Sequence, residues 1–289
     1  MVLQPFQSFR FAHARHRKLQ TNLQTISNLR HEQLNFNWRF VMFSFALLAL
    51  AGLLAGAVNA IAGGGTLISF PALISVGVPP IMANATSTLT ALPGYISSAW
   101  AFRRDIRAEG TLGLRAIAII AAVGGLVGAG LLLVTPGDAF TGIVPWLLLT
   151  ATGLFALGPS LLRVVRTRSL NPAGPLLSAC AVGAVAIYGG YFNGGLGIML
   201  LAVFGLIGFE NLNGMNGLKS LLSAVLSLVS VITYATAGLI AWEPAVTLAI
   251  ATTIGGYLGG HYARGLPPRL LRFGIILVGA VLTVVFFLR

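Results

Sequence analysis

The chain has 289 residues, of which 56% are hydrophobic and only 8% are charged, with a mean hydropathy of +0.89. A water-soluble globule of this size needs more polar surface than this composition supplies, so an integral membrane protein is predicted. The 18 Lys and Arg residues outnumber the 6 Asp and Glu residues. Because the basic residues fall in short clusters between apolar runs, they indicate membrane topology and argue against a nucleic-acid partner.

The N-terminal residues 1–38 differ in composition from the rest of the chain. They are basic and lack the apolar core of a secretory signal. We expect them either to form a dispensable, largely mobile, cytoplasmic extension before the membrane part, or to result from a start assigned too early, with Met42 as the alternative start.

Apolar segments follow one another from residue 40 to the end of the chain. Eight of them are long enough, at about 17–25 residues, to cross a bilayer as helices. They are 40–62, 81–102, 112–134, 141–165, 174–192, 212–240, 244–263 and 270–288. Two others, 66–77 and 196–208, are too short to span and are predicted to be broken or re-entrant helices. The predicted fold class is therefore all-α, a polytopic helical membrane protein.

The two short segments occupy matching places in the chain. Each follows a glycine cluster, AGGG at 62–65 and NGGLG at 193–197. Shifting the chain by 132 positions places Pro80 over Leu212 and Asn84 over Asn216. We interpret this order of parts as two pseudo-symmetric membrane repeats, 39–168 and 169–289. Repeated halves with interrupted helices are typical of secondary transporters, whose site lies between the halves.

A break inside the membrane also suggests what the site binds. The N-terminus of each short helix carries about half a positive charge, and glycine lets a ligand approach the backbone closely. The alternative is that glycine only permits tight helix packing, which we expect for most of the 36 glycines, including the run VGGLVGAG at 123–130. For the two clusters that open short helices, we favour an anion site.

Two long stretches carry a resemblance to a known family. They are NAIAGGGTLISFPALISVGVPPIMANATSTLTALPGYISSAWAFRRDI in the first half and GGYFNGGLGIMLLAVFGLIGFENLNGMNGLKSLL in the second. In their order of features they resemble the sulfite exporter TauE/SafE family of membrane transporters, also called the toluene sulfonate uptake family. The resemblance covers about residues 42–289. It implies a permease of the cytoplasmic membrane for small sulfur-containing anions such as sulfite, thiosulfate or sulfonates.

Polar residues near the breaks suit an oxyanion, which accepts hydrogen bonds. The predicted substrate-binding residues are Gly63, Gly64, Gly65, Thr66, Asn84, Thr86 and Ser87 in the first half and Asn193, Gly194, Gly195, Asn216 and Lys219 in the second. Lys219 is the only lysine of the membrane region, where a charge costs about 2.5–3.5 kcal/mol on insertion scales. It either contacts the anion, as we favour, or extends its ammonium to the membrane interface.

Other conspicuous side chains are assigned to ordinary roles. Tyr95, Trp100, Trp146 and Trp242 are expected to anchor the protein at the membrane interface. Cys180, the only cysteine, lies in an apolar run and is expected to be buried and inert.

The sequence contains no catalytic motif, so no enzyme, catalytic residue, metal or cofactor is predicted. The expected partners are a small anionic substrate and the lipid bilayer, and a homo-oligomer is compatible with the sequence. Because the cell interior is negative, the membrane potential alone drives anion export, with proton coupling through Glu210 as the alternative. Two other functions stay open, which are transport of another small organic anion and a membrane scaffold or assembly protein.

Overall fold

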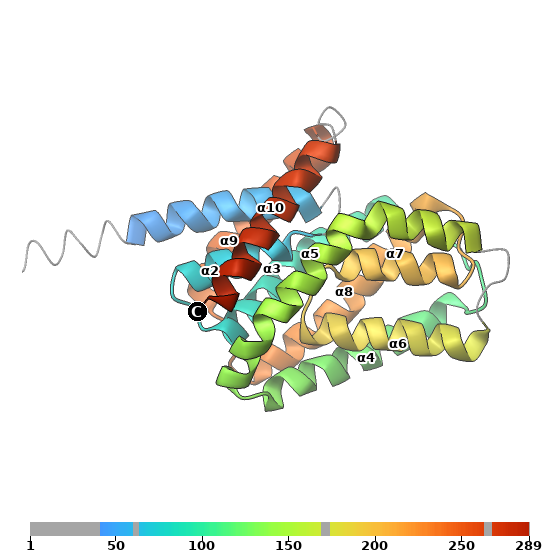
Figure 1. Cartoon of the computed structure of the whole chain (residues 1–289), viewed down its shortest axis with the longest axis horizontal. Helices are drawn as coiled ribbons and strands as arrows, with labels where there is room; N and C mark the ends of the chain where they lie inside the picture. The colour runs from blue at the N-terminus through green and yellow to red at the C-terminus, as the bar shows by residue number, and fades with distance from the viewer. Residues whose placement is uncertain (1–40, 60–63, 169–173, 263–267, 289) are drawn as a thin grey trace, which may run out of the picture. The chain divides into compact units, whose positions relative to one another are not determined.

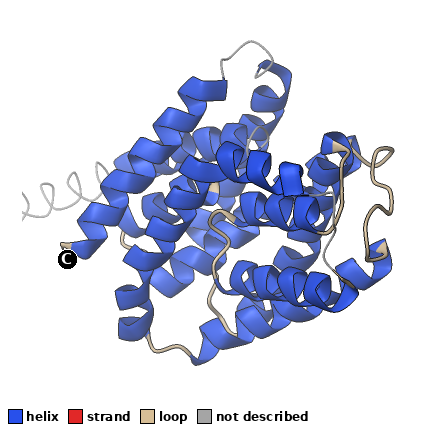
Figure 2. Ribbon diagram, turned by 45° about the vertical axis from the view of Figure 1, so that its right-hand side comes forward, coloured by secondary structure: helices blue, strands red, loops and turns tan. Residues whose placement is uncertain are grey.

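The structure is a computed structural model that describes residues 41–59, 64–168, 174–262 and 268–288. The predicted extension 1–38 and Gly63 of the predicted site lie outside the described residues. Residues 47–289 form one compact unit, and the description below concerns this unit. Its described residues are helices joined by loops and turns, without a strand (Figure 2).

The described residues form eight long helices and two short ones, which confirms the predicted all-α membrane fold (Figure 1). The long helices are Val41–Asn59, α3 (Pro80–Ala101), α4 (Leu114–Val134), α5 (Gly137–Arg168), α6 (Pro175–Tyr191), α8 (Leu212–Thr236), α9 (Trp242–Tyr262) and α10 (Pro268–Phe287). The short helices are α2 (Thr66–Ser75) and α7 (Leu196–Leu206), and both begin directly after a glycine, as predicted.

Four of the described helices are both long and apolar enough to cross a membrane by length and composition. They are Val41–Asn59, α4, the stretch Gly137–Gly158 of α5, and α8. The 22-residue α3 is also long enough, but its sequence is rich in Thr, Ser and Asn, most of which are buried. A long helix with polar residues on its inner side is expected where helices surround a polar site.

Glycines bring α4 and α6 into close contact, and the two helices lie side by side in Figure 1. A Cβ atom added to Gly124 would lie 2.5 Å from the Cβ atom of Ala186. One added to Gly128 would overlap the backbone at Ile187. The expectation that the glycine run 123–130 serves helix packing is confirmed at these positions, because a side chain there would push the helices apart.

The first helix and α9 also pack through glycines. A Cβ atom on Gly56 would overlap the Thr252 carbonyl, and one on Gly255 would overlap the Leu53 carbonyl. A Cβ atom on Gly52 would lie 2.6 Å from that of Ala251. Since increasing residue numbers on one helix meet increasing numbers on the other, the two helices run parallel.

Two clusters of buried apolar side chains hold the unit together. The first surrounds α2 with residues that include Phe70, Phe140 and Phe192, and the rings of Phe70 and Phe192 meet edge to face at 5.6 Å. The second surrounds α7 with side chains from α4, α6 and α8. Tyr95 lies in neither cluster and packs with Ala91 and Ala224.

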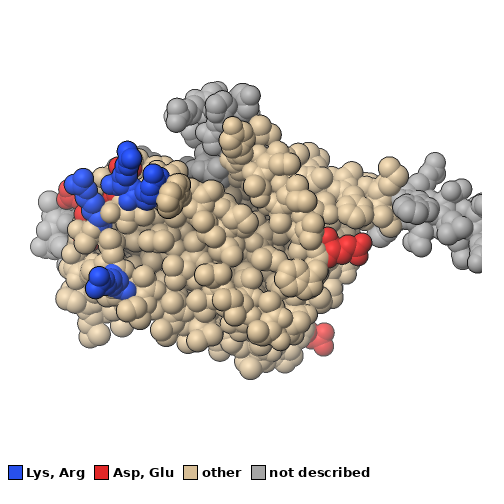
Figure 3. Space-filling model, turned by 180° about the vertical axis from the view of Figure 1, so that it is seen from behind, with Lys and Arg blue, Asp and Glu red and all other residues tan. Residues whose placement is uncertain are grey.

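Charged side chains are confined to a few places on the surface. Figure 3 shows Lys and Arg side chains gathered at one end of the visible face, and acidic side chains also at the opposite end. Arg103, Arg104 and Arg107 follow directly on α3, and Arg115 lies in the first turn of α4. The guanidinium of Arg103 lies 4.3 Å from the ring centre of Trp100, which is 68% exposed.

Candidate functional site

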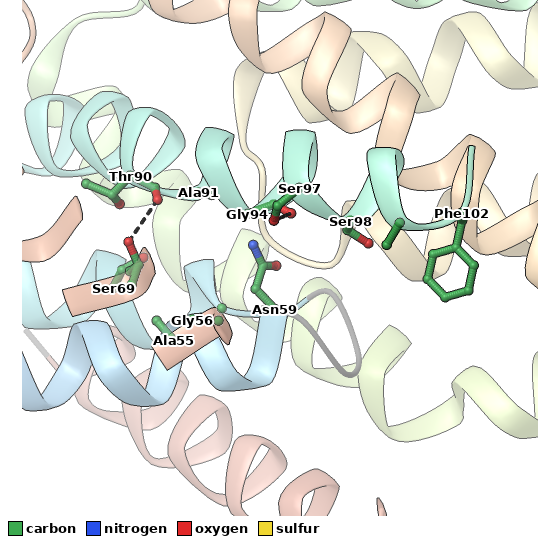
Figure 4. A pocket seen from close by; sticks show the side chains of 14 residues that line it. Ala55, Gly56, Asn59, Ser69, Thr90, Ala91, Gly94, Ser97, Ser98 and Phe102 are labelled. Carbon is green, nitrogen blue, oxygen red and sulfur yellow. Dashed lines mark hydrogen bonds between the residues drawn. The ribbon is translucent and has the colours of Figure 1, made fainter. Parts of the chain in front are cut away.

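A pocket of about 390 Å³ lies between the first helix, the start of α2, α3 and α9 (Figure 4). Its polar lining consists of hydroxyl and amide side chains, namely Asn59, Ser69, Thr90, Ser97, Ser98 and Thr252. Small residues complete the wall, together with Phe102 at one end: Ala55, Gly56, Gly65, Ala91, Gly94, Ala101 and Gly256. Because these residues are small, no long side chain extends from them into the pocket.

The pocket is deep at one end and open at the other. At the deep end, Ser69 of α2 is 2% exposed and Thr90 of α3 is 1% exposed. Ser97 and Ala101, near the end of α3, are exposed. The pocket therefore runs along α3 from Thr90 to Phe102, which directly precedes Arg103.

The described lining residues carry no charge, and several of their hydroxyl groups donate to neighbouring carbonyls. Thr252 donates to the Thr90 carbonyl at 3.1 Å, and Ser97 donates to the Gly94 carbonyl at 3.0 Å. The Ser98 and Ser220 hydroxyls lie 2.9 Å apart. In Figure 4 the Asn59 amide points toward α3 near Gly94, and its Oδ1 has no hydrogen-bond partner.

At the first break, packing accounts for the described glycines. A Cβ atom on Gly64 would lie 2.7 Å from the Phe155 ring, and one on Gly65 would overlap the Ala55 carbonyl. Gly65 also lines the pocket, directly before Thr66, the first residue of α2. No described side chain caps the first turn of α2, whose Leu67 and Ile68 N–H groups donate to the Gly64 and Gly65 carbonyls at 3.1 and 2.9 Å.

At the second break, the backbone conformation of Gly195 favours glycine over any other residue. Gly195 has φ +75°, in the left-handed region that L-residues with side chains rarely adopt. A Cβ atom on Gly194 would lie 2.5 Å from the Phe192 ring. Asn193 is 1% exposed, and its amide donates to the Ser227 hydroxyl at 3.2 Å.

The two breaks meet at Tyr95. Its hydroxyl donates to Asn193 Oδ1 at 3.3 Å, and the side chains of Asn59 and Thr66 approach the same hydroxyl. Tyr95 is 6% exposed, so the prediction that it anchors the protein at the membrane interface is wrong. Position along the helix suggested an interfacial residue, but the ring faces the inside of the unit, where its hydroxyl finds polar partners.

Three predicted residues of α3 are fully buried, and two of them, Asn84 and Thr86, join α3 to other segments. Asn84 donates to the Tyr191 carbonyl at 2.8 Å, while its Oδ1 has no partner. The Thr86 hydroxyl accepts from the Ala241 N–H at 3.0 Å, and Ser87 donates to the Asn84 carbonyl at 2.9 Å. None of the three lines the pocket.

The predicted pair on α8 lies on the other side of the Ser98–Ser220 contact. Lys219 is 9% exposed and donates to Asn216 Oδ1 at 3.1 Å. No carboxylate in the described part of the chain pairs with its ammonium. Neither Asn216 nor Lys219 lines the pocket, but Ser220 beside them contacts Ser98, which does.

Sequence reasoning missed most of the pocket lining. Thr90, Gly94, Ser97, Ser98 and Ala101 follow one another at spacings of three, four and one residues on α3. This is a stripe of small and polar residues on one helix face, and its period is the signal that could have found the site.

Two further observations concern Cys180 and metal binding. Cys180 is exposed on α6, so the expectation that it is buried is wrong, because its face of the helix lacks a protein neighbour. Among the described residues, no group of three or more His, Cys, Asp and Glu side chains gathers that could hold a metal ion.

Comparisons with known proteins agree with this architecture. The family model described as "Sulfite exporter TauE/SafE" matches residues 48–286. A probable membrane transporter protein YfcA of Escherichia coli is 30% identical over 252 residues, which cover 86% of this chain and 92% of the relative. A probable membrane transporter protein of Haemophilus influenzae is 29% identical, with coverage of 82% and 92%.

A third relative, the probable membrane transporter protein ORF9 of Sinorhizobium, is 26% identical over 83% of this chain and 90% of its own length. No solved structure matches the chain. The family model covers the whole helical unit from near the start of its first helix to the end of α10. The chain therefore belongs to the sulfite exporter TauE/SafE family of membrane transporters.

Proposed function

We propose that this transporter carries small sulfur-containing oxyanions, such as sulfite, thiosulfate or sulfonates, out of the cell across the cytoplasmic membrane. The observation that carries the proposal is the pocket of hydroxyl and amide groups beside the start of α2. Oxyanions accept hydrogen bonds, which amide and hydroxyl groups donate; the Thr252 and Ser97 hydroxyls would turn to the ligand from the Thr90 and Gly94 carbonyls. Among the described residues, no carboxylate lines the pocket to repel such a ligand.

Neutral donors suit transport better than a fixed positive charge inside the pocket would. A carried ion must bind strongly enough to enter and weakly enough to leave. Lys219 does not line the pocket, but its neighbour in the chain, Ser220, contacts the pocket residue Ser98. It attracts the anion from there without holding it in a direct ion pair.

The direction of transport follows from the charges near the pocket mouth. The mouth lies near the end of α3, directly before Arg103, Arg104 and Arg107. Loops rich in arginine face the cytoplasm, so we place the mouth on that side. An anion bound from the cytoplasm is driven outward by about 2.3 kcal/mol per charge per 100 mV.

The proposal is tested with purified protein in liposomes under an imposed potential. Loaded sulfite should leave at a rate that saturates with concentration and rises with the potential, and thiosulfate should compete. Thr252→Val removes a hydroxyl from the pocket and should weaken apparent affinity several-fold. Thr141→Val, which removes an exposed hydroxyl on α5, is the matched control and should leave affinity unchanged.

The result decides between the proposed substrates and their alternatives. Absence of sulfite, thiosulfate and sulfonate flux above that of protein-free liposomes would refute the substrate class. Flux of carboxylates alone would assign the pocket to another small organic anion. Equal behaviour of both valine variants would separate this pocket from the transport path.

A further inference from the structure

The Tyr95 hydroxyl lies where the two helix breaks meet, but Tyr95 does not line the pocket. Tyr95 follows Gly94 on α3, and Gly94 lines the pocket while Tyr95 lies behind its wall. Of the two side chains that approach the Tyr95 hydroxyl from the first half, Asn59 lines the pocket and Thr66 follows the pocket residue Gly65. The Tyr95 hydroxyl therefore lies beside one pocket residue, Asn59, and beside Thr66, the neighbour of another.

On its other side the same hydroxyl reaches the second break. It donates to Asn193 Oδ1, and the Asn193 amide donates in turn to Ser227 on α8. Asn193 and Ser227 are 1% and 0% exposed, so no water replaces these bonds. Directly after Asn193 come Gly194 and Gly195, the latter with its left-handed backbone, and then α7.

We propose that Tyr95 is a positioning residue that couples occupancy of the pocket to the conformation of the second break. The proposal rests on the proposed function, because it concerns the same pocket. It adds a mechanism for transmitting binding from the first half of the chain to the second.

The coupling follows from the hydrogen-bonding capacity of the groups. A tyrosine hydroxyl has one proton to donate, and here Asn193 receives it, while the Asn59 amide and the Thr66 hydroxyl can donate to its oxygen. An oxyanion in the pocket competes for the amide of Asn59, which lines it. When that amide turns to the ligand, the Tyr95 oxygen loses a donor, and its bond to Asn193 is free to rearrange.

A buried Asn193 without that partner is costly, because a desolvated amide oxygen would be left unpaired. The second break is therefore the element that shifts when the pocket fills. Two sites linked in this way affect each other reciprocally, so a change at either break changes the other.

Tyr95→Phe tests the coupling, because it removes only the hydroxyl. We expect the half-saturation concentration for sulfite in liposomes to change by less than about twofold and the maximal flux to fall at least tenfold. Tyr257→Phe is the control for loss of a tyrosine hydroxyl, since Tyr257 is 75% exposed on α9 and does not line the pocket. This control should keep at least half of the maximal flux.

Amide hydrogen exchange provides a readout that does not depend on flux. In the wild-type protein, sulfite should change the exchange of residues 190–197 as well as that of residues 64–70. In Tyr95→Phe the change should persist at 64–70 and vanish at 190–197. Asn193→Ala removes the acceptor and should give the same pattern, so it replaces Tyr95→Phe if that variant does not fold.

The outcomes separate this inference from the proposed function. Wild-type protein that moves none of sulfite, thiosulfate and sulfonates refutes the proposed function. Wild-type flux with an unaffected Tyr95→Phe variant overturns the coupling alone. A variant that loses affinity and flux in parallel makes Tyr95 a ligand, and unchanged exchange at 190–197 in sulfite-loaded wild type also overturns the proposal.

Discussion

Replacing Lys219 by methionine is predicted to weaken sulfite binding about 30-fold without impairing membrane insertion. Methionine keeps the apolar length of the side chain and removes the ammonium of a residue that is 9% exposed and donates to Asn216 Oδ1. Because the described residues offer it no carboxylate, the charge is left for the substrate. Lys219 does not line the pocket, although its neighbour Ser220 contacts the pocket residue Ser98. We therefore expect its ammonium to attract a bound anion through space.

The magnitude follows from Coulomb's law. Two unit charges about 8 Å apart attract by about 2 kcal/mol at an effective dielectric constant of about 20. A loss of about 2 kcal/mol corresponds to a factor of about 30 in affinity. If the ammonium instead contacts the anion directly, a charge-assisted hydrogen bond of about 1.5–3 kcal/mol gives a similar or larger loss.

Lys219→Arg distinguishes these two cases. Through-space attraction survives the exchange, because the charge is kept, whereas a direct contact in a tight site suffers from the planar guanidinium. The assay is sulfite flux from liposomes over a concentration series at constant potential. Expression of the methionine variant should be unchanged or improved, since a charge within the membrane has been removed. An unshifted half-saturation point would show that Lys219 has no part in anion binding.

Three further predictions concern the helix contacts. Gly195→Ala should lower thermal stability in detergent by about 1 kcal/mol or more, because φ is +75° and Ala151 is close, whereas Gly130→Ala, with open space at its Cα atom, should be neutral. Gly56→Ala should destabilise the protein by about 1–3 kcal/mol, because its Cβ atom would overlap the Thr252 backbone; equal melting temperatures of this variant and Gly130→Ala would contradict it. Ser98→Ala and Ser220→Ala should show a coupling of about 0.5–1.5 kcal/mol in a double-mutant cycle of unfolding, and additive effects would mean that their contact contributes nothing.

The sequence determined the class of protein and the order of its helices. Hydropathy reports on the solvent that surrounds each segment, and segment length against bilayer thickness separates long helices from short ones. The segments 66–77 and 196–208 therefore corresponded to α2 and α7, and α8 begins 132 positions after α3, the shift at which the two halves were compared. The division into two repeats stays a prediction.

Tertiary structure decided which polar residues lie together. Along the chain, Asn84 and Thr86 are closer to the first break than Ser97 and Ser98 are, yet the first two bond to residues next to α9 and at the end of α6 while the second two line the pocket. The reason is rotation about the helix axis. Each residue turns by about 100°, and packing against neighbouring helices decides which face of α3 meets the pocket.

Tertiary structure also assigned the glycines and Tyr95. A glycine in a sequence permits either close packing or an unusual backbone, and only the partner atoms distinguish Gly65, which meets the Ala55 carbonyl, from Gly195, with its left-handed φ. Tyr95 lies 98 positions from Asn193 along the chain, and nothing local indicates that pair. Contacts over such separations depend on how whole helices pack, which is why hydropathy and spacing predicted the helices but not the junction between their breaks.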